Sequence, residues 1–359
     1  MKQNFIFKSC SIRARKRFNV LLTPFIVGAF AQATWASEKN VIQQIAVVAE
    51  PTASVASAAA VRQAYRVVDF AWRDDARNRD VPSRLYWPEH ASPDAKVPLV
   101  VFSHGLGGSQ LGYSHLGRYW ASQGIASLHV RHAGSDRGIW TANVFSLVGN
   151  MQKAASEENA VARAQDVSFG ITRLFGETAY ADALKRDAIA VAGHSYGANT
   201  ALLVGGATIN RDGQTLSWRD PRVKALVVIS APPFVGEGDM AKILENVAIP
   251  TLHVTGTNDV IRVPGYRSDY ADRLAVFDAQ SASANKALTV FKGATHSIFT
   301  DRIDQAGREL NDQVKRATRE ISGLFLRSVL YGDTPQSMQD WAGAQTSLLE
   351  KFVPLRAIP

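Results

Sequence analysis

Residues 97–102 (VPLVVF) constrain the fold of this chain most strongly, because they are apolar at every position. A strand that is apolar on both faces has to be covered on both faces, as in a parallel sheet between two helical layers. The polar residues that follow, Ser103 and His104, mark where this strand is expected to end.

The rest of the chain alternates in the same way. Strands are predicted over 65–71, 83–87, 97–102, 126–130, 188–192, 223–229, 251–255 and 287–291. Helices are predicted over 116–123, 160–175, 199–204, 240–247 and most of 304–330. This alternation predicts an α/β fold with one doubly wound, mostly parallel sheet, and the first two strands are expected to pair as an edge hairpin. Functional residues of such sheets lie at the carboxyl ends of the strands.

Residues 1–36 have the layout of a secretory signal peptide. Six basic residues and no acid are present, an apolar run covers 18–31, and Ala31, Ala33 and Ala36 suit a cleavage site. A membrane anchor is the alternative, but the run is shorter than the ~20 residues of a span and contains Pro24. Residues 37–64 are expected to form a loose leader, and 65–359 a single domain.

The positive charge of the chain lies mostly in this segment. The net charge is +8, and the six basic residues of 1–36 leave only +2 for the remainder. We therefore expect no nucleic-acid partner. The single cysteine, Cys10, also precedes the cleavage site, so neither disulfides nor a cysteine-based zinc site are expected. A periplasmic or secreted protein without a membrane span is predicted.

The pentapeptide at 193–197, GHSYG, fits the G-x-S-x-G pattern. It follows a predicted strand and precedes a predicted helix, which is the setting of a nucleophile elbow with Ser195 as nucleophile. An ordinary glycine-rich turn is the alternative. The glycines of 103–109 (SHGLGGS) follow the strand at 97–102, and we predict an oxyanion hole from the backbone N–H groups of Leu106 and Tyr196. A phosphate-binding loop is less suitable here, because the lysine of a P-loop is missing.

A serine nucleophile needs a histidine base and an acid that orients it. With the chain order nucleophile, acid, histidine, only His253 and His296 remain downstream. His253 falls inside a strand, whereas His296 follows one, so His296 is predicted as the base. Asp259, just past another strand, is predicted as the acid. A metal site at His129 and His132 would lack further ligands, and no metal or cofactor is expected.

These motifs together resemble the α/β-hydrolase superfamily. The segments are PLVVFSHGLGGSQLGYSHLGRYWASQGIA, HAGSD, GHSYGANTA, TGTND and GATHSIF, within a likeness that spans residues 69–341. The chain most resembles the branch of platelet-activating-factor acetylhydrolases and bacterial dienelactone-hydrolase-like esterases. The resemblance implies the α/β-hydrolase fold and a serine esterase.

The sequence departs from that branch in three places. The acetylhydrolases carry their acid after the strand that follows the elbow, where this chain has Ser230, and Asp259 matches the broader superfamily instead. Arg131 and Ala133 replace an aspartate and a proline that the family often has beside its HPGSD-like turn. Dienelactone hydrolases use a cysteine nucleophile, whereas this chain has a serine.

Residues 138–158 are predicted to cap the acyl pocket. Trp140, Val144, Val148 and Met151 recur at helical spacing, and a plain core-facing helix is the alternative. We predict Trp140, Phe145 and Tyr266 as substrate-binding residues, which implies an apolar acyl or aromatic group in the substrate.

The prediction that follows is an exported serine hydrolase that cleaves a small-molecule or lipid-like carboxylic ester through an acyl-enzyme. A lipase or polyester depolymerase with the same triad is the alternative. A non-catalytic binding protein on the same fold ranks below both, because all three triad positions are filled.

Cleavage near Ala36 is the first testable consequence, because small residues follow the apolar run there. Mass spectrometry of exported protein is expected to show an amino terminus within a few residues of Ser37. An exported form that begins at Met1 would contradict the signal peptide.

Overall fold

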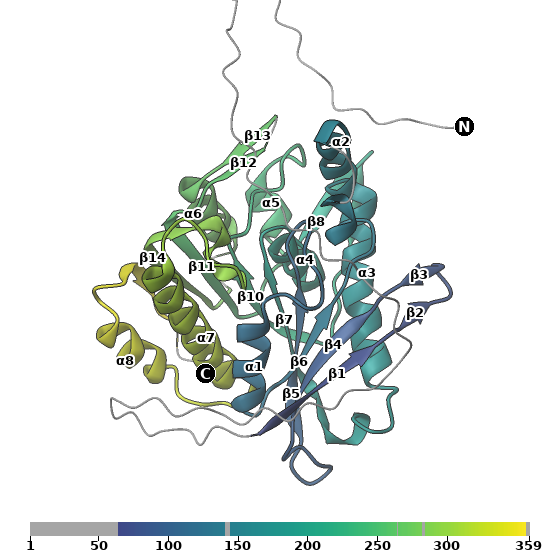
Figure 1. The fold of residues 1–359 in the computed structure, drawn as a ribbon, viewed down its shortest axis with the longest axis vertical. Coiled ribbons are helices and arrows are strands. Elements are labelled where there is room, and N and C mark those ends of the chain that lie inside the picture. Colours follow the sequence, from purple (N-terminus) through teal and green to yellow (C-terminus); the bar gives the residue numbers. More distant parts are fainter. Residues whose placement is uncertain (1–63, 141–143, 264, 282–283, 357–359) are drawn as a thin grey trace, which may run out of the picture. The chain divides into compact units, whose positions relative to one another are not determined.

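The computed structural model describes residues 64–140, 144–263, 265–281 and 284–356. The predicted signal peptide and nearly all of the predicted leader lie outside these residues. The described part contains a nine-stranded sheet in the order β1-β4-β6-β5-β7-β10-β11-β14-β15 (Figure 1). Six central strands run parallel: β6 (Ala126–Val130), β5 (Val97–Ser103), β7 (Leu184–His194), β10 (Val223–Ile229), β11 (Thr251–Asn258) and β14 (Lys286–Thr295).

Antiparallel strands close both edges of the sheet. β1 (Tyr65–Phe70) and β4 (Ser83–Pro88) form the expected edge hairpin, and β15 (Leu349–Val353) pairs with β14 on the other side. Three small ribbons lie outside the sheet: β2 (Arg73–Asp74) with β3 (Arg79–Asp80), β8 (Thr208–Arg211) with β9 (Gln214–Ser217), and β12 (Ile261–Val263) with β13 (Tyr266–Ser268).

Helices cover both faces of the sheet (Figure 1). The α-helices are α1 (Ser114–Ser122), α2 (Val144–Ala154), α3 (Glu157–Leu174), α4 (Tyr196–Gly205), α5 (Met240–Leu244), α6 (Tyr270–Ala279), α7 (Arg308–Leu330) and α8 (Gln336–Ala344). Short 3-10 helices are η1 (Arg137–Trp140), η2 (Ala181–Ala183) and η3 (His296–Phe299).

The apolar run of β5 is buried throughout because its alternate side chains enter two separate cores. Leu99 and Val101 pack with α3 and α4, whereas Val100 and Phe102 pack with α1 and α7. This two-sided burial is what an apolar strand in a parallel sheet requires. The doubly wound α/β fold predicted from the sequence is confirmed.

The topology reverses direction beside β5. The chain passes from β5 through α1 to β6 on one side, and then returns across β5 to β7 on the other. The carboxyl ends of β5 and β7 therefore lie at a topological switch point, which is the usual location of a functional site in an open α/β sheet.

One element prediction is wrong in detail, and another is confirmed with a later start. Trp140 does not continue the helical spacing of 144–151, because it belongs to η1 and α2 begins only at Val144. The helix expected over most of 304–330 is confirmed as α7, which begins at Arg308 because Gly307 has a φ of 87° and the preceding Asp304 accepts hydrogen bonds from Ala306 and Asn311 in a turn. The three ribbons, α6, α8 and β15 are not predicted from the sequence.

Five histidines of the described part are nearly inaccessible to solvent: His104, His129, His132, His194 and His253. Burial is the largest cause that lowers their pKa values, to about 3 for His194, to about 4 for His129 and His253, and well below the usual range for the other two. These side chains are therefore neutral in the folded protein at neutral pH.

This burial predicts an acid-sensitive fold. Unfolded histidines titrate near ~6.5, so below that pH the unfolded chain binds more protons than the folded one, and each histidine costs up to ~1.4 kcal/mol of stability per pH unit. We expect Tm to be constant above about pH 7 and to fall steeply between pH 6.5 and 4.

Thermal unfolding followed by circular dichroism across this range tests the prediction. His253→Gln is a suitable control, because His253 lies inside β11 and its ring Nε2 bonds to the side chain of Gln280. That variant is expected to lose less stability on acidification than the unmodified protein. An equal Tm at pH 7 and pH 5 would contradict the prediction.

Candidate active site

Ser195 forms a sharp turn between a strand and a helix. β7 ends at His194 and α4 begins at Tyr196, so this one residue makes the turn. Its φ of 55° and ψ of −123° lie in a region that L-residues rarely occupy. Such strain is typical of a nucleophile elbow, and the turn has the strand–turn–helix setting expected for 193–197.

Two glycines let the elbow pack closely against its neighbours. A β-carbon on Gly193 would lie 2.1 Å from the carbonyl oxygen of Gly197, and one on Gly197 would lie 2.0 Å from that of Ser103. A side chain at Gly193 would therefore push α4 away from β7, and one at Gly197 would push α4 away from the end of β5. The glycines bring Ser195 next to the loop that follows β5.

A continuous hydrogen-bond chain links Ser195, His296 and Asp259. The Ser195 hydroxyl lies 2.9 Å from Nε2 of His296, and Nδ1 of His296 lies 2.8 Å from Oδ1 of Asp259. His296 opens η3 directly after β14, and Asp259 follows β11. With its proton on Nδ1, His296 can accept the serine proton at Nε2, which is the arrangement that activates a serine.

The carboxylate of Asp259 is fully buried, and its partners keep it ionised. Thr255 donates its hydroxyl hydrogen to Oδ2 at 2.8 Å, and the buried guanidinium of Arg273 lies 3.4 Å from Oδ1. Burial alone would raise the pKa of Asp259, but the hydrogen bond and charge of His296, together with the charge of Arg273, outweigh it and hold the pKa below its usual range. Asp259 is thus a fixed negative charge behind His296.

Sequence reasoning missed Arg273, because it missed the helix that carries it. A capping box formed by Asp269 and Asp272 starts α6 and places Arg273 toward Asp259. The pattern of two aspartates three residues apart before an apolar run is the signal that could have found this helix. Ser230, at the acid position of the acetylhydrolases, is buried directly after β10.

His194 packs behind His296 as a neutral side chain. Its Nε2–H donates to the backbone oxygen of His296 at 2.9 Å, and its Nδ1 accepts the hydroxyl hydrogen of Tyr113 at 2.9 Å. The Tyr113 oxygen also accepts the N–H of Gly105 at 3.3 Å. These bonds tie the elbow to the backbone of His296 and to the loop after β5.

The N–H groups of Leu106 and Tyr196 donate no hydrogen bond within the described part of the chain. The loop is fixed on both sides of Leu106, because Gly105 donates to Tyr113 and Gly107 donates to the carbonyl oxygen of Ser135 at 2.8 Å. Tyr196 is the first residue of α4, where N–H groups have no partner inside the helix. Two free donors on the adjoining segments meet the chemical requirement of an oxyanion hole.

The three predicted substrate-binding residues lie in different places. Trp140 is half exposed, and its indole N–H donates to the carbonyl oxygen of Gly107 at 2.9 Å, so it borders the loop of Leu106. Tyr266 is partly exposed on β13. Phe145 belongs to α2, but its side chain lies outside the described residues.

The other histidines of interest have structural partners. His253 bonds to Gln280, His129 to the backbone oxygen of Gly112, and His132 to Asp166. Within the described ranges, no three His, Cys, Asp or Glu side chains gather as they would around a metal ion.

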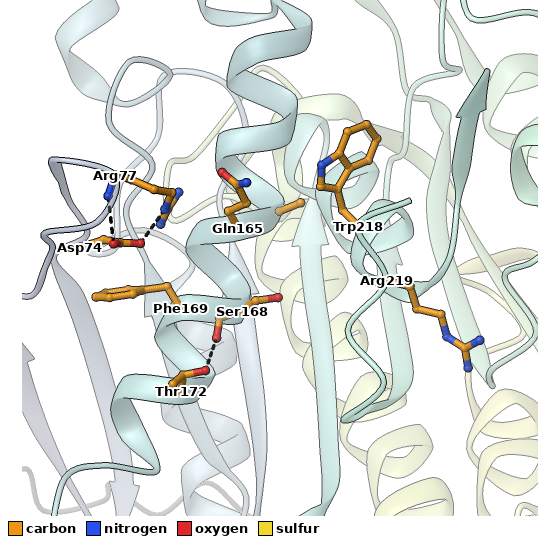
Figure 2. Close-up of a pocket in the computed structure, with 9 residues that line it drawn as sticks. Asp74, Arg77, Gln165, Ser168, Phe169, Thr172, Trp218 and Arg219 are labelled. Carbon is orange, nitrogen blue, oxygen red and sulfur yellow. Dashed lines mark hydrogen bonds and ion pairs between the residues drawn. The ribbon is translucent and has the colours of Figure 1, made fainter. Parts of the chain in front are cut away.

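Two cavities lie beside α3 and not at Ser195. The first, of about 410 Å³, is bordered by Arg77, Phe169 and Trp218, and Figure 2 shows these side chains around the helix. The second, of about 380 Å³, shares Thr172 with the first and is bordered by Arg186 and Arg222. Neither cavity is lined by Ser195, His296 or Asp259.

Two family models and one known protein are similar to this chain. Residues 78–163 match a family model described as platelet-activating factor acetylhydrolase, isoform II, and residues 151–267 match one described as lipase (class 3). The platelet-activating factor acetylhydrolase of Cavia porcellus is 23% identical over 319 residues, covering 78% of this chain and 67% of that protein. The first match contains Leu106, and the second contains Ser195 and Asp259.

Asp259→Asn tests whether this carboxylate orients the histidine. An uncharged amide should favour the wrong tautomer of His296 and no longer stabilise its charged form, so turnover is expected to fall by at least ~10²-fold with the fold retained. Turnover of a soluble ester and circular dichroism measure the two quantities.

Asp278→Asn is the matched control, because Asp278 is an exposed aspartate on α6. It is expected to keep full activity. Near-normal turnover in Asp259→Asn would place the orienting acid elsewhere.

Proposed function

Because this chain is a carboxylic ester hydrolase of the α/β-hydrolase superfamily, similar to platelet-activating factor acetylhydrolases and lipases, we propose that Ser195, His296 and Asp259 are its catalytic triad. The single observation that carries this proposal is the unbroken hydrogen-bond chain from the strained Ser195 through His296 to the buried Asp259.

The reaction proceeds through an acyl-enzyme. The Ser195 oxygen attacks the ester carbonyl carbon while its proton passes to Nε2 of His296, and the resulting imidazolium is stabilised by the Asp259 carboxylate. The negative charge that develops on the carbonyl oxygen is stabilised by the N–H groups of Leu106 and Tyr196. His296 then protonates the departing alcohol.

Deacylation repeats these steps with water. His296 takes a proton from a water molecule, the water oxygen attacks the acyl carbon, and the acid leaves as Ser195 recovers its proton. No metal or organic cofactor enters this scheme.

The substrate is proposed to be a small-molecule or lipid-like ester with an apolar acyl group. The indole of Trp140, beside the loop of Leu106, is suited to contact such a group. Export to the periplasm or the medium is proposed from residues 1–36, and none of the described helices is both long and apolar enough to cross a bilayer.

A lipase or polyester depolymerase is the second candidate, and one observation favours it. The large apolar side chains that are exposed in the described structure are Leu111, Trp140, Val235 and Ile303. Each lies in a segment that follows the carboxyl end of a parallel strand, at the edge of the sheet where Ser195 lies. An apolar border there would suit a substrate held at an interface.

Chromogenic esters of graded acyl length, assayed below and above their solubility limits, separate the two candidates. We expect hydrolysis of dissolved short-chain esters. Activity that begins only above the solubility limit would favour the interfacial candidate.

Ser195→Ala tests the nucleophile in the same assay. It is expected to lose at least ~10³-fold in turnover and all labelling by a fluorophosphonate, because the attacking oxygen is removed. Ser337→Ala, on α8, is the control and should label normally. Labelling at another serine, or unchanged hydrolysis by Ser195→Ala, would overturn the proposal.

A further inference from the structure

A second Asp–His–Ser chain lies beneath the loop after β5. Asp166 Oδ2 lies 3.0 Å from Nδ1 of His132, and Nε2 of His132 lies 2.9 Å from the hydroxyl of Ser103. The order of hydrogen bonds, from aspartate through histidine to serine, is the same as in Asp259, His296 and Ser195. In this second set, however, all three side chains are fully buried. Because no substrate can reach Ser103, this second set of hydrogen-bonded residues has a role other than nucleophilic attack.

The serine end of this buried chain meets Arg163, a residue of α3 that is also fully buried. Its guanidinium donates to the hydroxyl oxygens of Ser103 at 3.1 Å, Ser135 at 2.8 Å and Thr200 at 3.0 Å. It also donates to the backbone oxygen of His104. One planar group with donors in fixed directions therefore joins three segments of the chain.

These partners belong, or are hydrogen-bonded, to the two segments that carry the free N–H groups. Ser103 and His104 precede Leu106, separated from it by Gly105 alone, and the backbone oxygen of Ser135 accepts the N–H of Gly107. Thr200 lies one turn after Tyr196 on α4.

The Arg163 guanidinium also stacks over the ring of Tyr196, 4.6 Å from its centroid. Arg163 thus contacts both the loop and the helix end that carry the donors.

The charge of Arg163 is not cancelled by direct contact with a carboxylate among the described residues. Asp166 is connected to it only through His132 and Ser103, and the short ion pairs of Asp166 are with Arg77 and Arg79. Burial lowers the pKa of Arg163 to about 10, so the group stays cationic at neutral pH. A charge held in a low-dielectric interior acts over a longer range than one in water.

We propose that Arg163 is a positioning residue for ester hydrolysis, which holds the N–H groups of Leu106 and Tyr196 in place and adds a fixed positive charge behind them. This inference rests on the proposed function, because it requires an oxyanion formed by attack from Ser195. It assigns the buried Asp166–His132–Ser103 chain the role of orienting Ser103 toward Arg163.

Arg163→Gln removes the charge and most of the donors, and Arg163→Lys keeps the charge but loses the planar fork. Arg222→Gln is the matched control. Arg222 also bonds to α3, at Ser168 and Thr172, and in addition to Asp220, but it lies just before the amino end of β10, whereas Ser195 follows the carboxyl end of β7.

Turnover of a dissolved ester is measured per active site, with sites counted by complete fluorophosphonate labelling. The inhibition constant of an alkylboronic acid, which forms a negatively charged tetrahedral adduct with a serine, is measured beside it.

We expect Arg163→Gln to lose ~10²-fold in kcat per labelled site with KM changed less than threefold, and the boronic acid to bind more weakly in the same proportion. Arg163→Lys is expected to lose about 10-fold, and Arg222→Gln less than threefold. If the Gln variant does not fold, the Lys variant decides alone, since a lysine keeps a positive charge and N–H donors for the same buried oxygen acceptors.

Normal kcat per labelled site in the Arg163 variants, with only Tm lowered, would overturn the inference and leave Arg163 a purely structural residue. A change confined to KM would overturn it as well. Activity that persists in Ser195→Ala would instead refute the proposed function, whatever the Arg163 variants do, so the two failures are distinguishable.

Discussion

The contact between two pieces of backbone, at Gly197 and Ser103, determines the geometry of the whole site. Because no β-carbon separates them, α4 and the end of β5 approach to a distance that no other residue would permit. The elbow at Ser195 and the loop of Leu106 therefore share one location at the topological switch point. Both proposed oxyanion donors depend on that approach, since each comes from one of the two segments.

Charge is distributed around this contact in an ordered way. The histidines that pack beneath the site are neutral because they are buried. Asp259 stays ionised because the hydrogen bond and charge of His296 and the charge of Arg273 outweigh its burial, and Arg163 stays cationic because burial lowers its pKa only to about 10. The negative charge of Asp259 lies behind His296, and the positive charge of Arg163 lies behind the loop that contains Leu106. This separation matches the charges that develop during ester hydrolysis, a positive imidazolium and a negative oxyanion.

The two Asp–His–Ser chains show that hydrogen-bond connectivity alone does not define a catalytic serine. Both have distances of 2.8 to 3.0 Å between their members. They differ in backbone and access: Ser195 lies on a strained turn and is partly exposed, whereas Ser103 ends a buried strand. Ser195 can meet a substrate because it lies on the partly exposed turn after β7, whereas Ser103 cannot because it is buried at the end of β5. This difference in access separates the proposed nucleophile from a structural hydroxyl.

The sequence by itself determined the α/β fold, because residues 97–102 and the strands that follow are apolar on both faces and alternate with helices. It also placed Ser195, Asp259 and His296 at strand ends, since short motifs and chain order suffice when catalytic groups occupy the same edge of a sheet. Arg273, the Arg163 contacts and the ribbons could not be derived in this way.

Only the tertiary structure decided which buried charges meet, that Trp140 leaves the helix of the predicted cap, and that Ser103 bonds to His132. Such contacts join residues far apart in the chain, and the spacing of neighbouring residues carries no information about them.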